Sequence, residues 1–401
     1  MKVLGTRWHH TARVDPKAET AQLKSRLVVQ GVKTIPFLSS FGPTFTPLPR
    51  WDVATGGDTV FIKQPPGFEV PGREDHEYQL KRAAYGLPQS GRAFHLKVKD
   101  KLDQLDFVSL SEGVTLYIGR RGGDYVILVI YVDDGLIAGK KALVEDVVGE
   151  LQEDFDVTFG GTVDGKSFLG RDISHDPQTG SILVSVKSQI EKALKMHGFE
   201  NIKPLHMPIQ PGVVYVEWDG EAIKPSEYLS AVGSLLFIAT TASMSIHPRT
   251  LDYGLEYTPD SSPLRGFEAY SDQTGGACPT TSRSTMGYVF LLANGAVSWS
   301  SKLQPRVTAS LTEAEYLGLS HACKETVYLT QLLGELGFPA EGAAVLYGDN
   351  QGANALSKDP QFHNRTRHLR LTEHFVREQV QDGSICVEYI PTARMLADAM
   401  T

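Results

Sequence analysis

The chain has 401 residues, a hydrophobic content of 41% and a formal net charge of −8, which allow roughly two or three buried cores. No apolar stretch is long enough to cross a bilayer, and the first residues lack a signal-peptide core, so we expect an intracellular protein with no membrane partner. The three cysteines, Cys278, Cys323 and Cys386, form no Cys-x-x-Cys pair, which argues against a zinc site and a disulfide framework.

The beginning of the chain is basic although the whole chain is acidic. Residues 1–110 carry 16 Lys and Arg against 11 Asp and Glu, a balance of +5, which leaves −13 for the rest. Phosphate contacts require Lys and Arg, so this segment is a candidate nucleic-acid surface. The alternative is a solvated charged face without a ligand.

The strongest local pattern is a pair of adjacent carboxylates between two apolar segments. Residues 125–130 lead into Asp133 and Asp134, and residues 135–139 lead out, which predicts a strand, a tight turn and a second strand. Adjacent carboxylates repel unless they share a cation, and Mg²⁺ prefers oxygen ligands, so this turn is a candidate metal site. The alternative is a solvated Asp-Asp turn, which ordinary turn chemistry also favours.

Further elements follow from periodicity and from proline breaks. Residues 90–106 and 142–156 have helical periodicity and flank the Asp-Asp strand pair. Residues 180–186 read as a strand and 190–197 as a short helix, and the prolines of 200–225 then indicate a connector. Strands, helices and a hairpin mixed in this way predict an α+β fold.

Four carboxylates in the last third of the chain occupy the ends of predicted elements. Asp272 and Asp349 each close a strand. Glu315 lies in the first turn of a helix with an apolar face, and Asp398 opens the last predicted helix. Glu313 is the rival to Glu315, but the two project from different faces of that helix. The alternative for each acid taken singly is an ordinary surface charge.

Short motifs follow one another in a fixed order along the chain. The first group comprises Lys63 to Phe68, Tyr85 to Gln89 with Arg92, Tyr131 to Asp134, and Phe168 to Gly170. The second group comprises Arg283 to Tyr288, Ser298 to Lys302, Glu313 to Tyr316, Asp349-Asn350 and Ala397-Asp398. Over roughly residues 20 to 401 these motifs resemble the Pol polyprotein of copia-type retrotransposons, the first group its reverse transcriptase and the second its ribonuclease H domain.

This resemblance implies a fold and a division into domains. Residues 1–199 would form a right-hand polymerase with fingers, palm and thumb, and residues 200–263 a connector. Residues 264–401 would form an α/β ribonuclease H-like domain, preceded by the break at 257–263. The resemblance also implies four kinds of partner: an RNA template, a DNA primer, an RNA–DNA hybrid and deoxynucleotide triphosphates. It implies a place in the cytoplasm, within a virus-like particle, or in the nucleus.

The resemblance also assigns roles to the acidic residues, with two Mg²⁺ ions in each active site. In the polymerase the metal ligands would be Asp52, Asp133 and Asp134, with Gln89 and Arg92 near the template or the nucleotide. In the ribonuclease H domain the ligands would be Asp272, Glu315, Asp349 and Asp398.

Departures from the family pattern predict an impaired enzyme. Family segments on both sides of Asp52, near residues 48–60, are missing, and with them a palm strand and its packing helix. Since catalysis depends on positioning, we expect weak polymerase activity. Only three residues follow Asp398, too few for a helix that would hold its carboxylate. The ribonuclease H activity is therefore expected to be the better preserved of the two, although limited at that end.

The sequence leaves a second hypothesis open. The chain could be an RNA-directed DNA polymerase with ribonuclease H activity, impaired by its deletions. It could instead be a catalytically dead retrotransposon remnant that at most binds nucleic acid through its basic first part. A host ribonuclease H-like enzyme is disfavoured, because the segments 85–89 and 131–134 have no place in one.

Overall fold

The computed structural model describes residues 3–4, 6–15, 20–29, 60–80, 87, 90–110, 115–131, 134–200, 224–242, 253–259, 266–274, 281–358 and 375–401. It divides into two compact units, Met1–Phe159 and Gly160–Thr401. Both units mix helices and strands, as the α+β prediction requires. Within the described ranges, no helix has the length and apolar character of a membrane span.

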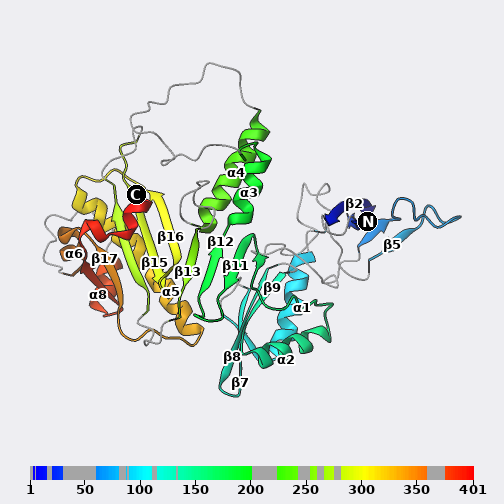
Figure 1. The fold of residues 1–401 in the computed structure, drawn as a ribbon, viewed down its shortest axis with the longest axis horizontal. Coiled ribbons are helices and arrows are strands. Elements are labelled where there is room, and N and C mark those ends of the chain that lie inside the picture. Colours follow the sequence, from blue (N-terminus) through cyan, green and yellow to red (C-terminus); the bar gives the residue numbers. More distant parts are fainter. Residues whose placement is uncertain are drawn as a thin grey trace. The chain divides into compact units, whose positions relative to one another are not determined.

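The first unit is built around a four-stranded antiparallel sheet in chain order. Its strands are β6 (Phe107–Ser109), β7 (Leu116–Arg121), β8 (Asp124–Tyr131) and β9 (Asp134–Gly139). Helices α1 (Ser90–Gln104) and α2 (Lys141–Gln152) share a buried core with this sheet (Figure 1). The core side chains are Val98, Leu102, Phe107, Tyr117, Val126, Leu128 and Val147. Both helices that periodicity predicted beside the Asp-Asp strand pair are therefore confirmed.

The tight hairpin between β7 and β8 depends on two glycines. Arg121 pairs with Asp124, so the connection is Gly122-Gly123, and both glycines have positive φ, 58° and 87°. Two consecutive left-handed residues form the turn whose twist matches that of the flanking strands. The hairpin fixes the register of β8, the strand that leads to the predicted carboxylate pair.

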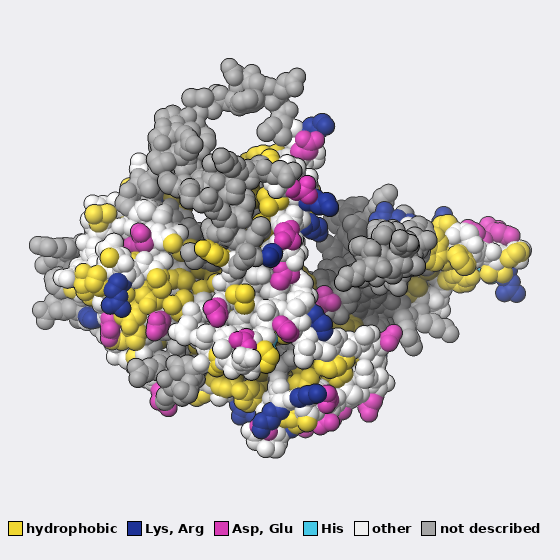
Figure 2. All heavy atoms as spheres, viewed as in Figure 1, with side chains coloured by type: hydrophobic (Ala, Val, Ile, Leu, Met, Phe, Trp, Pro, Cys, Tyr) yellow, Lys and Arg dark blue, Asp and Glu magenta, His cyan; other side chains and the backbone are white. Residues whose placement is uncertain are grey.

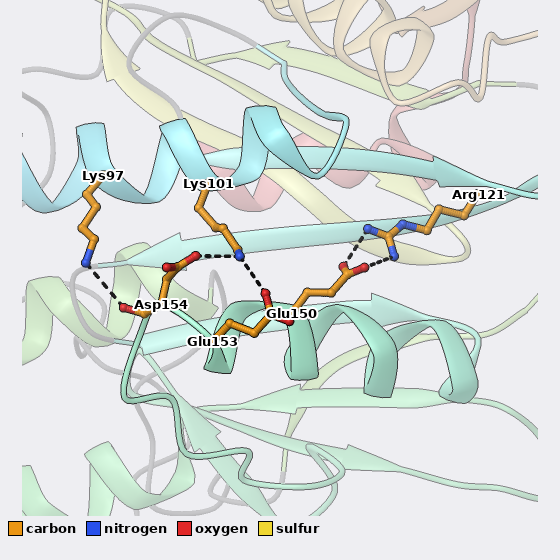
Figure 3. A network of polar contacts seen from close by, with 6 residues as sticks. All are labelled: Lys97, Lys101, Arg121, Glu150, Glu153 and Asp154. Atoms are coloured by element: carbon orange, nitrogen blue, oxygen red, sulfur yellow. Dashed lines mark hydrogen bonds and ion pairs between the residues drawn. The ribbon is translucent and has the colours of Figure 1, made fainter.

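Charged side chains join α1, α2 and β7 at the surface of the first unit (Figure 3). Arg121 of β7 donates two hydrogen bonds to Glu150 of α2, over 2.9 and 2.7 Å. Lys101 of α1 lies 2.6 Å from a carboxylate oxygen of Asp154 and 3.2 Å from one of Glu153. These contacts are partly exposed, so the apolar core holds the helices and the ion pairs add modestly to it.

The remaining strands of the first unit form two small sheets. β2 (Thr6–Asp15) and β3 (Thr20–Val29) make a long antiparallel pair. β1 (Val3–Leu4) pairs in parallel with β4 (Phe61–Lys63), which pairs in turn with β5 (Glu77–Gln79).

The second unit begins with a four-stranded antiparallel sheet. Its strands are β10 (Lys166–Phe168), β11 (Arg171–His175), β12 (Ile182–Ser185) and β13 (Gly254–Tyr257). α3 (Lys187–Met196) and α4 (Pro225–Ala242) pack on one another through Ile190 and Ile238. The predicted strand at 180–186 and helix at 190–197 are confirmed as β12 and α3. β13 lies within the segment expected to be a connector and pairs with β12.

The rest of the second unit is a five-stranded mixed sheet (Figure 1). Its spatial order is β16 (Gly295–Leu303), β15 (Thr285–Leu292), β14 (Glu268–Gln273), β17 (Ala344–Gly348) and β18 (Ile385–Tyr389). The first three are antiparallel to one another, and β17 and β18 run parallel to β14. The chain therefore starts at the centre of the sheet and builds outward in both directions.

Helices cover the two faces of this sheet unequally. α5 (Leu311–Glu335), α6 (Gln351–Lys358) and α8 (Phe375–Gln381) share one core with it. The other face carries the short 3-10 helices η6 (Thr392–Arg394) and η7 (Leu396–Met400), with Met395 and Ala397 buried beside Tyr270 and Val289. β15 is thus buried on both faces, which explains why its sequence is apolar nearly throughout.

The ends of α5 follow from local chemistry. Ser310 caps its start by accepting a hydrogen bond from the backbone N–H of Glu313 over 3.2 Å. Past its last turn, Gly337 has a φ of 87° and the backbone N–H of Phe338 donates to the carbonyl of Leu333 over 2.9 Å. Local contacts therefore fix where α5 begins and ends.

Candidate metal centre

The predicted polymerase residues are only partly within the described structure. Asp52, Gln89 and Asp133 lie outside the described residues. Asp134 is exposed and is the first residue of β9, directly after the segment that joins β8 to β9. Arg92 is half-buried in the first turn of α1. The strand pair that was predicted around the carboxylates is confirmed. The metal-binding role of Asp52, Asp133 and Asp134 stays a prediction.

Among the described residues on the face drawn in Figure 2, surface charge does not by itself mark a nucleic-acid face. On the face drawn in Figure 2, the coloured Lys and Arg side chains are interspersed with Asp and Glu. A phosphate backbone attracts basic side chains gathered on one surface. The nucleic-acid surface that the positive net charge of residues 1–110 suggested therefore stays a prediction from the sequence.

Parallel pairing brings Asp272 and Asp349 together in the second unit. Asp272 is the penultimate residue of β14, and Asp349 directly follows β17. The two strands are parallel neighbours with Ser271 opposite Gly348, so both carboxylates reach the same edge of the sheet. Asn350 caps the start of α6 by accepting a hydrogen bond from the backbone N–H of Ala353 over 3.1 Å. Asp349 directly precedes this cap, and its carboxylate lies near that of Asp272.

Glu315 comes to the same edge because α5 approaches β14 closely at Gly318. A Cβ at Gly318 would lie 3.2 Å from Ser271 Oγ and 3.4 Å from the carbonyl oxygen of Asp272. Glu315 is three residues earlier on the same face of the helix, so this close approach delivers its carboxylate to Asp272. Glu315 is the fifth residue of α5, one step beyond the first turn in which the sequence placed it.

The three carboxylates form a compact cluster. Ligand oxygens of Asp272, Glu315 and Asp349 all lie within 4.8 Å of one another. Burial, together with the charges of Asp272 and Asp349, raises the pKa of Glu315 to about 8. Burial also raises the pKa of Asp272, and the charges of Asp349 and Asp398 add to the rise. Negative charge is gathered here at an electrostatic cost that a bound cation would relieve.

Asp398 lies close by but outside this 4.8 Å group. It is exposed, in the middle of η7, and its charge acts on Asp272. The sequence predicted that the residues after Asp398 are too few for a helix that would hold its carboxylate. In the structure a one-turn 3-10 helix forms there, anchored by the buried Met395 and Ala397. The support comes from packing on the sheet, which does not require a long helix.

Glu313, the rival to Glu315, has a different role. Its carboxylate lies 2.5 Å from Arg306 Nη1 and accepts a hydrogen bond from the backbone N–H of Ala309 over 2.8 Å. These contacts tie the loop before α5 to the first turn of the helix. The choice of Glu315 over Glu313 is thus supported by where each carboxylate points.

The family profile described as reverse transcriptase (RNA-dependent DNA polymerase) matches residues 53–211. The Pol polyprotein of transposon RE2 from Arabidopsis thaliana is 30% identical over 452 residues, covering 100% of this chain and 31% of that protein. The chain is a homologue of copia-type Pol polyproteins. The Pol polyproteins of RE1, also from Arabidopsis thaliana, and of TNT 1-94, from Nicotiana tabacum, are each 29% identical and cover 100% and 99% of this chain.

This copia-type Pol homologue contains a segment that matches the reverse transcriptase family, and its described residues mix helices and strands. It spans about a third of the length of these relatives, 31%, 30% and 34%. Among solved structures, ribonuclease H1 from Halobacterium salinarum is 20% identical, with a TM-score of 0.24, and covers 33% of this chain and 92% of its own.

Two hydroxyl groups at the centre were missed by the sequence reasoning. Thr392 donates a hydrogen bond to Asp349, and Thr401 donates one to Asp272. Neither threonine belongs to a local pattern with its partner, because 43 and 129 residues separate the pairs. A sequence signal for such contacts would have required knowledge of the sheet order.

Proposed function

We propose that the second unit hydrolyses the RNA strand of RNA–DNA hybrids. The observation that carries this proposal is the convergence of Asp272, Glu315 and Asp349, from three separate elements, within 4.8 Å. The topology supports it, since these residues sit at one edge of a mixed sheet whose central strand carries Asp272. The homology to copia-type Pol polyproteins supplies the substrate class.

The donor set of the centre fits Mg²⁺. All the ligands are carboxylate oxygens, which hard divalent ions prefer. Asp272 is 6% exposed, so its charge lacks the hydration that it would have at the surface. The related enzymes use divalent metals, and a cluster of desolvated carboxylates also favours a divalent cation. We propose two Mg²⁺ ions, with Asp398 as a further ligand on the exposed side.

The protein's own residues would hold and orient the reacting groups. β14 and β17 fix two carboxylates at one sheet edge, and α5 closes the third side with Glu315. Bound Mg²⁺ would supply activation of the attacking water and stabilisation of the leaving oxygen of the phosphodiester. The rigid strand ends would keep the ligand oxygens in place throughout, which is the main contribution that a protein makes to such a site.

The test is cleavage of the RNA strand in an RNA–DNA hybrid with and without Mg²⁺. We expect cleavage by the full chain that falls at least about 100-fold in Glu315→Gln and in Asp272→Asn. Glu313→Gln is the matched control, because it removes a charge two residues away without touching the centre. Activity that survives Glu315→Gln would contradict the proposal.

We also propose RNA-directed DNA polymerase activity for residues 1–199, supported by the family profile and by the β8–β9 hairpin. Fingers, palm and thumb would lie in this part, with residues 200–263 as a connector and 264–401 as the ribonuclease H domain. Asp52, Asp133 and Asp134 would hold Mg²⁺. The partners would be an RNA template, a DNA primer and deoxynucleotide triphosphates, in the cytoplasm or the nucleus.

Primer extension tests the polymerase separately. We expect extension near background, because segments that position Asp52 in the family are missing near residues 48–60. Robust extension that is lost in Asp133→Asn would show that the remaining chain positions these residues well enough.

A further inference from the structure

Two threonine hydroxyls contact the carboxylate cluster from the C-terminal segment. Thr401 Oγ1 donates to Asp272 Oδ2 over 2.7 Å, and Thr392 Oγ1 donates to Asp349 Oδ2 over 2.6 Å. We propose that Thr401 and Thr392 are positioning residues, which orient these two carboxylates for a divalent cation. The inference rests on the proposed ribonuclease H function, because it concerns the same centre.

The chemistry of a carboxylate explains what such a contact does. Each aspartate has two oxygens, and a hydroxyl donor on Oδ2 fixes the rotation of the carboxylate while leaving Oδ1 outside that hydrogen bond. The cation can then be met by an oxygen that is already oriented. Groups that hold metal ligands in this way typically change metal affinity by about 10- to 100-fold when they are removed.

The hydroxyl of Thr401 has two acceptors in reach but only one proton. Asp272 Oδ2 lies at 2.7 Å and the carbonyl oxygen of Asp398 at 3.2 Å. The shorter contact goes to the carboxylate, and hydrogen bonds to charged acceptors are the stronger ones. We therefore infer that the Thr401 hydroxyl donates its hydrogen bond to Asp272. This contact also lowers the pKa of Asp272, in opposition to the effect of burial.

Gly287 makes room for Thr401 beside Asp272. It pairs with Asp272 across β14 and β15, and paired residues of antiparallel strands project to the same face of the sheet. A Cβ at Gly287 would lie 2.6 Å from the Cβ of Met400 and 3.0 Å from Cγ2 of Thr401. Because Gly287 has no side chain, the end of η7 fits beside it. The residue before η7, Met395, is buried.

Thr392 is placed by the end of β18. The backbone N–H of Ile390 donates to the carbonyl of Gly348 over 3.2 Å, which aligns the start of η6 with the residue before Asp349. Thr392 is exposed, whereas Thr401 is half-buried against an aspartate that is 6% exposed. Water competes with an exposed hydroxyl, so we expect Thr401 to have the larger effect of the two.

The experiment is Mg²⁺ titration by isothermal calorimetry, without nucleic acid, of the full chain carrying Asp133→Asn and Asp134→Asn, which remove the proposed polymerase ligands so that only the second-unit centre is measured. The variants are Thr401→Val, which keeps the shape and removes the hydroxyl, and Thr401→Ser, which restores the hydroxyl. We expect Thr401→Val to weaken the Kd for Mg²⁺ by about 10- to 100-fold and Thr401→Ser to recover most of it. Thr392→Val should show a smaller loss. Gly287→Ala should reproduce the loss seen in Thr401→Val, because it displaces η7.

Thr326→Val is the matched control. The hydroxyl of Thr326 is buried and donates to the carbonyl of Ala322 within α5, away from the carboxylates. We expect Thr326→Val to lower the melting temperature and leave the Kd for Mg²⁺ unchanged. A general loosening of the fold, by contrast, would move both quantities in every variant.

Asp272→Asn distinguishes failure of the positioning role from failure of the proposed metal centre. If it abolishes Mg²⁺ binding while Thr401→Val and Gly287→Ala bind like the natural chain, the positioning role is wrong and the proposed centre stands. If Asp272→Asn itself leaves Mg²⁺ binding unchanged, the proposed function is wrong. Weakening in Thr401→Ser equal to that in Thr401→Val would also overturn the role of the hydroxyl.

Discussion

At the scale of single residues, the centre is defined by charge that has been moved out of water. Glu315 is the clearest case, because burial and two neighbouring carboxylates raise its pKa from 4.5 to about 8. Buried carboxylates crowded by like charges are unfavourable, and such groups concentrate where a protein binds or reacts. From the raised pKa of Glu315 we therefore expect two measurable effects, one on stability and one on metal binding.

The first prediction concerns pH and stability in the absence of divalent ions. A carboxyl whose pKa is raised on folding binds its proton more tightly in the folded state. Glu315 should therefore stabilise the protein below about pH 4.5 and lose this contribution as the pH rises towards about 8. We expect the melting temperature in EDTA to fall over this window and Mg²⁺ to reduce the fall. Calorimetric scans at several pH values measure it, and an unchanged slope in Glu315→Gln would contradict the assignment.

The second prediction separates Glu313 from Glu315. Glu313→Gln breaks a largely buried ion pair with Arg306, so we expect a loss of about 1–3 kcal/mol in the free energy of unfolding. Its Kd for Mg²⁺ should stay the same, since Glu313 lies outside the cluster. Glu315→Gln should do the reverse, weakening Mg²⁺ binding without destabilising the metal-free protein. Denaturant unfolding and metal titration of the two variants decide between these roles.

At the scale of elements, close approach of α5 to β14 sets the position of Glu315. Gly318 faces Ser271, whereas Gly334 of the same helix has no atom within 4 Å of the place where a Cβ would stand. We therefore predict that Gly318→Val costs about 1–3 kcal/mol more than Gly334→Val, since the helix would be pushed from the sheet. The two variants share their effect on helix propensity, so their difference isolates the packing. Equal melting temperatures would show that α5 can shift without strain.

The ion pair between β7 and α2 supports a smaller prediction. Arg121 and Glu150 are 29% and 33% exposed and make two parallel hydrogen bonds (Figure 3). We expect a double-mutant cycle of Arg121→Ala and Glu150→Ala to give a coupling energy of about 1 kcal/mol, reduced by salt. Arg121→Lys should lose most of that coupling, because an ammonium cannot make the bidentate contact.

At the scale of the whole molecule, the two sheets of the second unit are joined through β13. Tyr257 Oη donates to the carbonyl of Ala296 over 2.7 Å, and the backbone N–H of Thr258 donates to the carbonyl of Ala293 over 2.9 Å. The ring of Tyr257 also occupies the space that a side chain at Gly295 would need. The segment 200–263, expected to be a connector, thus contributes a strand that packs on the β15–β16 hairpin.

A comparison of two fragments tests this arrangement. We predict that residues 160–401 melt at a higher temperature than residues 264–401, because the shorter fragment loses β13 and its contacts with the hairpin. Both fragments should bind Mg²⁺, since every carboxylate of the centre lies after residue 264. Tyr257→Phe in the full chain is the control for one lost hydrogen bond, about 1 kcal/mol. Identical melting temperatures would mean that 264–401 is an independent domain, as the sequence predicts.

Local patterns in the sequence were enough for much of this protein. The helices α1 and α2, the strands around Asp134 and the capped helix α5 are predictable, because periodicity, turn residues and caps act over a few residues. In each of these elements the deciding interaction lies within one turn or one strand, where the chain order itself brings the groups together. The choice of Glu315 over Glu313 rested on the resemblance, which uses the second Glu, because different helix faces alone do not say which of the two is the ligand.

Tertiary structure decided what the sequence could not. The support of Asp398 by a one-turn helix, the space at Gly287 for Thr401, and the contact of Thr392 with Asp349 all depend on sheet order. They join residues that are far apart in the chain, and packing against the sheet stabilises a segment too short to be helical alone. The sequence could name Asp272, Glu315, Asp349 and Asp398 as acids of one site. Only the parallel pairing of β14 with β17, and the approach of α5 at Gly318, brings three of them within reach of one cation.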